Sequence, residues 1–123
     1  MTPRMMREQA IDRLAWHDGQ FLEWRFVPGP KAADQVQLVF ALYKDHIHAR
    51  TRDRVAITCF GVRRLLASCD LPRLKEHAGA GNVIDGVHQE GVLRVLVTGG
   101  FLEVDAASFR VRVTRVRSRK KQA

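Results

Sequence analysis

Residues 92–114 read VLRVLVTGGFLEVDAASFRVRVT, and this stretch decides the fold class. Apolar side chains occupy every second position in three runs: Leu93, Val95 and Val97, then Leu102 and Val104, then Phe109, Val111 and Val113. A period of two is typical of strands with one buried face. Gly99-Gly100 suits a two-residue hairpin turn, and Ala106-Ala107-Ser108 suits a second link. We therefore expect an antiparallel meander of three strands, Val92–Thr98, Phe101–Asp105 and Phe109–Thr114.

Four earlier segments also have strand patterns. Leu22, Trp24 and Phe26 alternate with polar residues as far as Pro28-Gly29-Pro30, where proline removes ladder donors. Residues 54–62 carry apolar side chains on both parities, which predicts a central strand. The aromatic residues Trp24, Phe26, Phe40 and Phe60 all fall at positions that these patterns would mostly bury. The expected strands are Gln20–Phe26, Val36–Leu42, Arg54–Val62 and Asn82–His88.

Two short segments have features of helices. Apolar residues recur at helical intervals within Met5–Leu14. The segment Asp70–Gly79 opens on a residue that can accept first-turn amide hydrogens, has Pro72 in its first turn and closes on glycine. We expect a short N-terminal helix at the first segment and one short inserted helix at the second.

These elements predict a mainly β protein, with α+β as the alternative class. The expected architecture is an antiparallel sheet or a two-layer β-sandwich of about seven strands. With 123 residues the chain is long enough to bury one core. We expect residues 1–114 to form a single β-rich domain and residues 115–123 to form a basic, disordered tail.

The positive charge is concentrated at the C-terminal end. The formal net charge is +8, and no acidic residue follows Asp105. Such an end can neutralise phosphates on a nucleic acid, or it can serve as a solvated extension. The clustered basic residues are Arg110, Arg112, Arg115, Arg117, Arg119, Lys120 and Lys121.

The chain has the features expected of a cytoplasmic protein. Its first residues carry charges where a signal peptide needs an apolar run, and no apolar run approaches the roughly 20 residues of a membrane span. Cys59 and Cys69 lie outside any Cys-x-x-Cys motif, which argues against a zinc site or a disulfide framework.

His17-Asp18 is a candidate polar site, because a histidine oriented by a carboxylate can act as a general base. Adjacent residues rarely reach that geometry, so the alternative interpretation is a turn built on Asp18-Gly19. Cys59 falls inside an expected strand, where an inert buried thiol is usual. We therefore expect no catalytic residues.

His46 and His48 are spaced as two ligands of one metal ion would be if their loop were extended. Asp45 and Asp53 lie nearby, but a third ligand is not evident; His77 or His88 would have to supply it in space. A solvated polar loop is the alternative, and we predict neither a metal site nor a cofactor.

Three short motifs together resemble a known group of proteins: Trp16-His17-Asp18-Gly19-Gln20-Phe21-Leu22, Phe60-Gly61-Val62 and Gly81-Asn82-Val83-Ile84-Asp85-Gly86. The chain resembles small β-rich bacterial proteins, some of them grouped with polymorphic-toxin immunity proteins. The resemblance implies a non-enzymatic protein that works by binding a partner. The N-terminal helix and the basic tail that we expect here depart from that pattern.

The sequence therefore predicts a non-enzymatic binding module whose partner is a protein. The alternative is a nucleic-acid-associated protein that uses its basic tail. An enzyme that uses His17, Asp18 or the histidine loop is a third hypothesis.

Overall fold

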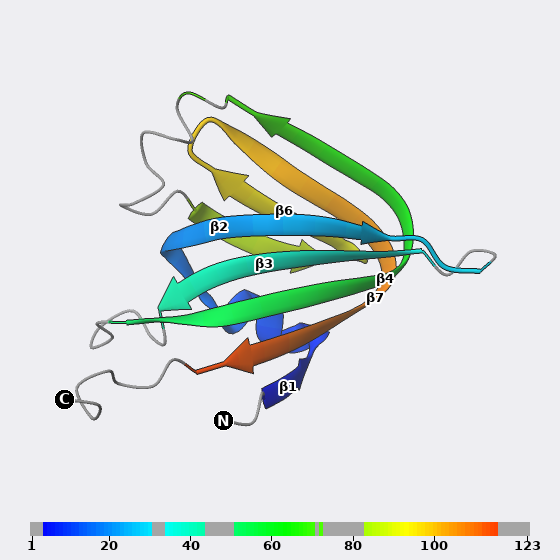
Figure 1. The fold of residues 1–123 in the computed structure, drawn as a ribbon, viewed down its shortest axis with the longest axis horizontal. Helices are drawn as coiled ribbons and strands as arrows, with labels where there is room; N and C mark the ends of the chain where they lie inside the picture. The colour runs from blue at the N-terminus through cyan, green and yellow to red at the C-terminus, as the bar shows by residue number, and fades with distance from the viewer. Residues whose placement is uncertain (1–3, 31–33, 44–50, 71, 73–82, 116–123) are drawn as a thin grey trace.

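The computed structural model describes residues 4–30, 34–43, 51–70, 72 and 83–115. Six antiparallel strands, β2 to β7, close into a barrel in the order β7-β4-β3-β2-β5-β6, with β6 paired back to β7 (Figure 1). The strands are β1 (Arg4–Arg7), β2 (Ala15–Val27), β3 (Gln35–Tyr43), β4 (Arg52–Cys69), β5 (Val83–Gln89), β6 (Val92–Val97) and β7 (Gly100–Thr114). The mainly β, antiparallel expectation is confirmed, but the sheet closes into a barrel rather than forming a sandwich.

The two long strands β4 and β7 make this closure possible. They pair from Arg54–Thr114 to Cys69–Gly100, with a register shift between Val62 and Arg64. The first half of β4 also pairs with β3, and the first half of β7 also pairs with β6. One continuous ribbon of two strands therefore belongs to both halves of the barrel, and it bends sharply between them (Figure 1).

The expected link at Ala106-Ala107-Ser108 is wrong, because β7 runs through these residues without a break. They lie at the bend, where Gly61 has a φ of 63° and a β-carbon on it would come within 3.0 Å of the Ala107 side chain. Small residues are needed here because the two strands approach closely, so a stretch that suggests a turn is a bend inside one strand.

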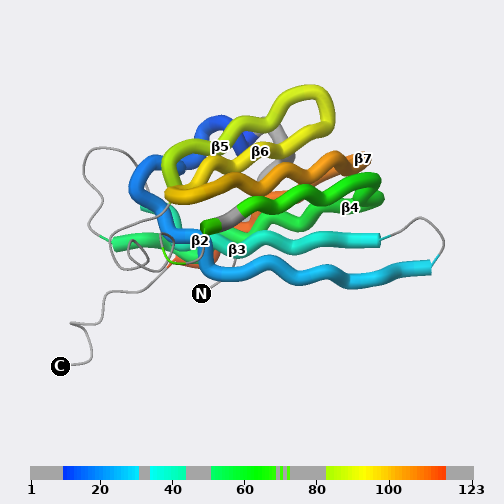
Figure 2. Tube along the Cα trace, turned by 90° about the horizontal axis from the view of Figure 1, so that it is seen from above, coloured from blue at the N-terminus to red at the C-terminus, as the bar shows by residue number. Residues whose placement is uncertain are grey.

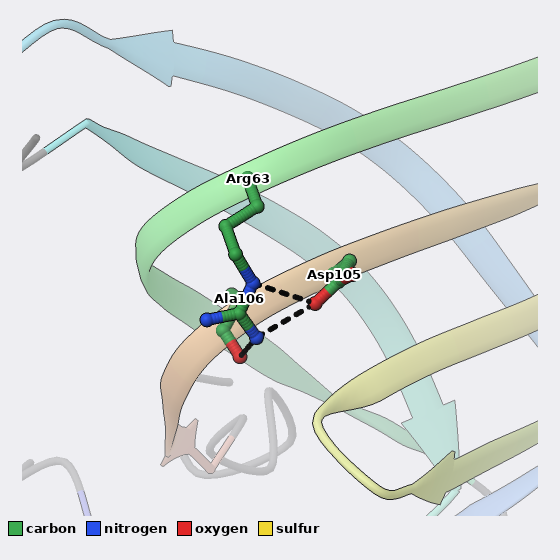
Figure 3. A network of polar contacts seen from close by, with 3 residues as sticks. All are labelled: Arg63, Asp105 and Ala106. Atoms are coloured by element: carbon green, nitrogen blue, oxygen red, sulfur yellow. Dashed lines mark hydrogen bonds and ion pairs between the residues drawn. The ribbon is translucent and has the colours of Figure 1, made fainter.

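Arg63 holds the outside of this bend. Its guanidinium donates to Asp105 Oδ1 over 3.1 Å and 2.8 Å and to the Ala106 carbonyl oxygen over 3.2 Å (Figure 3). Arg63 is the residue left unpaired by the register shift in β4. The bulge therefore directs this side chain across to β7.

The expected N-terminal helix over Met5–Leu14 is also wrong. Residues Arg4–Arg7 form β1, which pairs with Val113–Arg110 of β7, and Glu8–Arg13 form the 3-10 helix η1. The spacing of apolar residues favoured a helix. However, β6 does not reach the last part of β7, and β1 forms the backbone hydrogen bonds along that edge instead. The inserted helix expected over Asp70–Gly79 lies almost wholly outside the described residues.

Buried apolar side chains from every described part of the barrel form the core, including Val95, Val104 and Val111 of the meander. Trp16 closes one end of it: its indole meets the Phe40 ring edge-on at 5.1 Å and donates through Nε1 to the Ile11 carbonyl oxygen over 2.9 Å. This bond satisfies the one polar atom of the buried indole and fixes η1 against the barrel.

Two tight turns complete the meander. Glu90 and Gly91 have φ angles of 53° and 79°, which a two-residue hairpin of the primed type requires. The next turn is made by Thr98 and Gly99, because Val97 pairs with Gly100. It therefore lies one residue earlier than expected. In the part of the chain that the structure describes, no helix has the length and apolar character needed to cross a bilayer.

Val95 and its neighbour Leu96 test which face of the meander is the core. Val95 is fully buried and Leu96 is 42% exposed. Val95→Asp should abolish cooperative folding, because an unpaired carboxylate in the core costs several kcal/mol of a total stability of about 5–15 kcal/mol. Leu96→Asp should leave the fold intact. Circular dichroism and urea denaturation measure both, and a native-like Val95→Asp protein would refute the assigned face.

Gly86 tests the packing of Trp16. A β-carbon at Gly86 would lie 2.8 Å from Cζ2 of the indole and closer still to Cε2 and Cδ2. Gly86→Ala should therefore lower the free energy of unfolding by about 1–3 kcal/mol, because a rigid buried ring has to move. In a Trp16→Leu background the same change should cost much less. Denaturant titration of the native sequence, the two single variants and the double variant measures the coupling between Gly86 and Trp16. If Gly86→Ala lowered the free energy of unfolding equally in both backgrounds, the contact would be contradicted.

Candidate binding surfaces

His17 and Asp18 lie near the start of β2, on the open surface. His17 Nε2 is 3.6 Å from Asp18 Oδ2, and the two side chains are 72% and 61% exposed. Asp18 has a φ of 64°, and its carbonyl oxygen accepts two hydrogen bonds from Arg52. The two side chains are brought together, but β2 runs through both residues, and they sit where β2 changes register against β3. This is the geometry of a β-bulge inside a strand rather than the expected turn at Asp18-Gly19.

Cys59 is a fully buried thiol on β4. Burial raises its pKa from 9.0 to about 12, because an apolar environment disfavours the thiolate. At neutral pH the thiol is protonated and unreactive, as expected for a core residue.

The metal hypothesis cannot be followed in space, because His46, His48 and His77 lie outside the described residues. Within the described ranges no three His, Cys, Asp or Glu side chains gather closely enough to hold an ion. His88 instead packs edge-on against Phe109, with ring centroids 4.7 Å apart.

The structure separates the basic residues proposed as a binding tail. Arg110 and Arg112 are exposed on β7, and Arg115 follows that strand. Arg115 lines a cavity of about 250 Å³ together with Arg13, Tyr43 and Asp53, a volume below the roughly 300–1,000 Å³ of typical ligand pockets. Arg117, Arg119, Lys120 and Lys121 lie outside the described residues.

Arg110 and Arg112 belong to a larger set that charge counting along the chain does not reveal. In the register, Arg110 lies opposite Thr58 and Arg112 opposite Ala56, and the row of Thr58 continues through Gln37 to Arg25. These residues share the outer face of β2, β3, β4 and β7. We call this surface the arginine face; its arginines are Arg25, Arg52, Arg54, Arg110 and Arg112.

The opposite part of the barrel carries three arginines that are paired with two carboxylates. Arg94 and Arg64 both pair with Glu103, the latter at 3.7 Å, and Arg63 pairs with Asp105 at 2.8 Å. All three arginines lie on β4 or β6 beside β7. The two halves of the barrel therefore differ in net surface charge, although both are rich in arginine.

The apolar residues of β2 form a second surface, and here the expected burial of Trp24 and Phe26 is wrong. Leu22, Trp24 and Phe26 are 47%, 48% and 52% exposed. Trp24 and Phe26 point to the same side of the sheet as their buried partners Leu38 and Val36. They stay uncovered because, among the described residues, β2 pairs with β5 only at Gly19 and afterwards with β3 alone.

We call residues Leu22–Val27 the open edge. Figure 2 shows β2 running side by side with β3, with which it pairs as far as Val27. Alternation predicted correctly that Trp24 and Phe26 share a face, whereas their exposure reflects the lack of a second neighbour of β2 among the described residues. Phe60 is partly exposed as well, on the arginine face, whereas Phe40 is fully buried as expected.

Comparison with known proteins adds no relative: no family model, curated protein or solved structure matches this chain. The class that the fold and surfaces define is therefore a small antiparallel β-barrel with an arginine face and an apolar open edge.

The thiol of Cys59 gives a prediction for stability against pH. The unfolded thiol ionises near pH 9 and the native thiol only near pH 12, so the stability that comes from this difference is complete below pH 9 and is lost as the pH rises towards 12. The loss approaches about 1.4 kcal/mol for each pH unit. Urea denaturation between pH 8 and 11 should show a steeper decline for the native sequence than for Cys59→Ala, and parallel curves would contradict it.

Proposed function

We propose that the protein is a non-enzymatic binding module that takes an extended segment of a partner protein onto its open edge. The observation that carries this proposal is the exposure of three large apolar side chains, Leu22, Trp24 and Phe26, on a strand whose second side has no neighbour among the described residues.

The backbone of the open edge supplies the first half of the recognition. An unpaired strand edge presents a row of N–H and C=O groups that an added strand satisfies. β2 is already held in extended geometry by its pairing with β3 as far as Val27–Gln35. The site is therefore ordered before a partner binds, which lowers the entropic cost of association.

The side chains supply the second half. Trp24 and Phe26 lie two residues apart on one face, so an added strand that alternates apolar and polar residues would cover both with its apolar set. Tryptophan and other aromatic residues are also the side chains that contribute most at protein interfaces. Glu23 and Arg25 alternate with them on the opposite face and keep that face hydrated.

The resemblance to immunity proteins suggests which partner this would be, namely a toxin domain. The strand-addition mechanism does not depend on that choice. It requires only a partner segment that is extended and apolar on alternate positions.

A pair of matched variants tests the proposal. Trp24→Ser/Phe26→Ser removes the apolar side chains of the open edge, and Ile84→Ser/Leu96→Ser removes two comparably exposed side chains, 51% and 42%, from β5 and β6. Proteins captured from cells of the source organism and quantified by mass spectrometry should include a partner that the first variant loses at least tenfold and the second retains.

Hydrogen exchange on that complex gives the second readout. Alternate amides within Leu22–Val27, those whose N–H points away from β3, should gain protection when the partner is bound, because they become donors to the added strand, while those of β5 should not. A partner whose binding protects other strands and tolerates the Trp24/Phe26 substitutions would refute the proposal.

A further inference from the structure

The arginine face has a large excess of positive charge within the folded barrel. Glu23 pairs with Arg54 at 3.3 Å and with Arg25 at 3.7 Å, and Asp18 lies on β2 beside Arg52, so these two carboxylates oppose five arginines among the described residues of this half. Arg110 and Arg112 have no described carboxylate within ion-pair distance. Because the arginines of β4 and β6 on the other half are paired to Glu103 and Asp105, the excess belongs to this face.

The spacing of the charges suits an extended polyanion. Arg110 and Arg112 are two residues apart on β7, about 7 Å along the strand. Arg25 lies in the same row as Arg110 but three strands away, roughly 14 Å across the sheet. Thr58 and Gln37 lie between them in this row and offer uncharged hydrogen-bonding groups.

Two aromatic rings on the same face carry guanidinium groups. The Arg110 guanidinium lies 5.5 Å from the centroid of the Phe60 ring, and that of Arg52 lies 4.5 Å from the centroid of the Tyr43 ring. Both rings are partly exposed. A single-stranded nucleic acid needs flat groups on which its bases stack and cations that bind its phosphates. The acidic side chains of a protein need only the cations.

We propose that the arginine face binds single-stranded nucleic acid across the sheet, with phosphates at Arg25, Arg110 and Arg112 and bases stacked at Phe60 and Tyr43. This site lies within the folded barrel and is distinct from the open edge. It needs none of the basic residues after Arg115.

The test uses the full-length chain and a fluorescein-labelled oligothymidylate of twelve nucleotides, with binding followed by fluorescence anisotropy at several salt concentrations. Arg110→Gln/Arg112→Gln removes two charges from the arginine face, and Arg64→Gln/Arg94→Gln removes two from the opposite half, where both side chains are exposed. The first variant should raise Kd at least tenfold and lower the salt slope by about 1.4, because a single strand contributes about 0.7 for each phosphate neutralised. The second should change Kd less than threefold.

A third variant, Phe60→Leu, keeps every charge and should still raise Kd roughly fivefold or more, because stacking is lost. Circular dichroism confirms that each variant is folded. Equal weakening by the two double variants would overturn the proposal in favour of general charge. If polyglutamate competes as effectively as unlabelled oligonucleotide of equal charge, the ligand is an acidic protein and the proposal is overturned. If a duplex binds as tightly as a single strand, the proposal is overturned as well.

Discussion

β4 and β7 run side by side from Arg54–Thr114 to Cys69–Gly100, and every other strand of the barrel depends on that ribbon. β3 attaches to the first half of β4 and β2 attaches to β3, while β6 and β1 attach to successive parts of one side of β7. The ribbon can serve both halves only if it bends, and the bend requires Gly61 opposite the alanines of β7, with Arg63 bonded across it. Closure, core and surfaces all follow from this one curved pair of strands.

The sequence predicted those features that depend on neighbouring residues and missed those that depend on distant ones. The alternation of the meander identified the buried face of Val95, Val104 and Val111 correctly. Ala106-Ala107 suggested a turn, because nothing local distinguishes a turn from a bend that another strand supports. The apolar spacing of Met5–Leu14 suggested a helix, because the edge that β1 satisfies lies about a hundred residues further along the chain.

The candidate surfaces show the same division. Arg110 and Arg112 were evident from the charge run, but Arg25, Arg52 and Arg54 join them only through register, and the partners that neutralise the other arginines also come from separate strands. β2 contributes to both surfaces, with Trp24 and Phe26 on one side and Arg25 on the other. This one strand thus separates an apolar surface from a cationic one.

The pairing of β1 with the far half of β7 also governs how the chain can fold. Arg4 lies opposite Val113, so these contacts join residues near opposite ends of the sequence. Contacts of such long sequence separation form late, because much of the chain has to be ordered before they are favourable. During synthesis β1 has no partner until β7 has left the ribosome. Until the two strands pair, the edge of β7 that β1 covers is available to other chains.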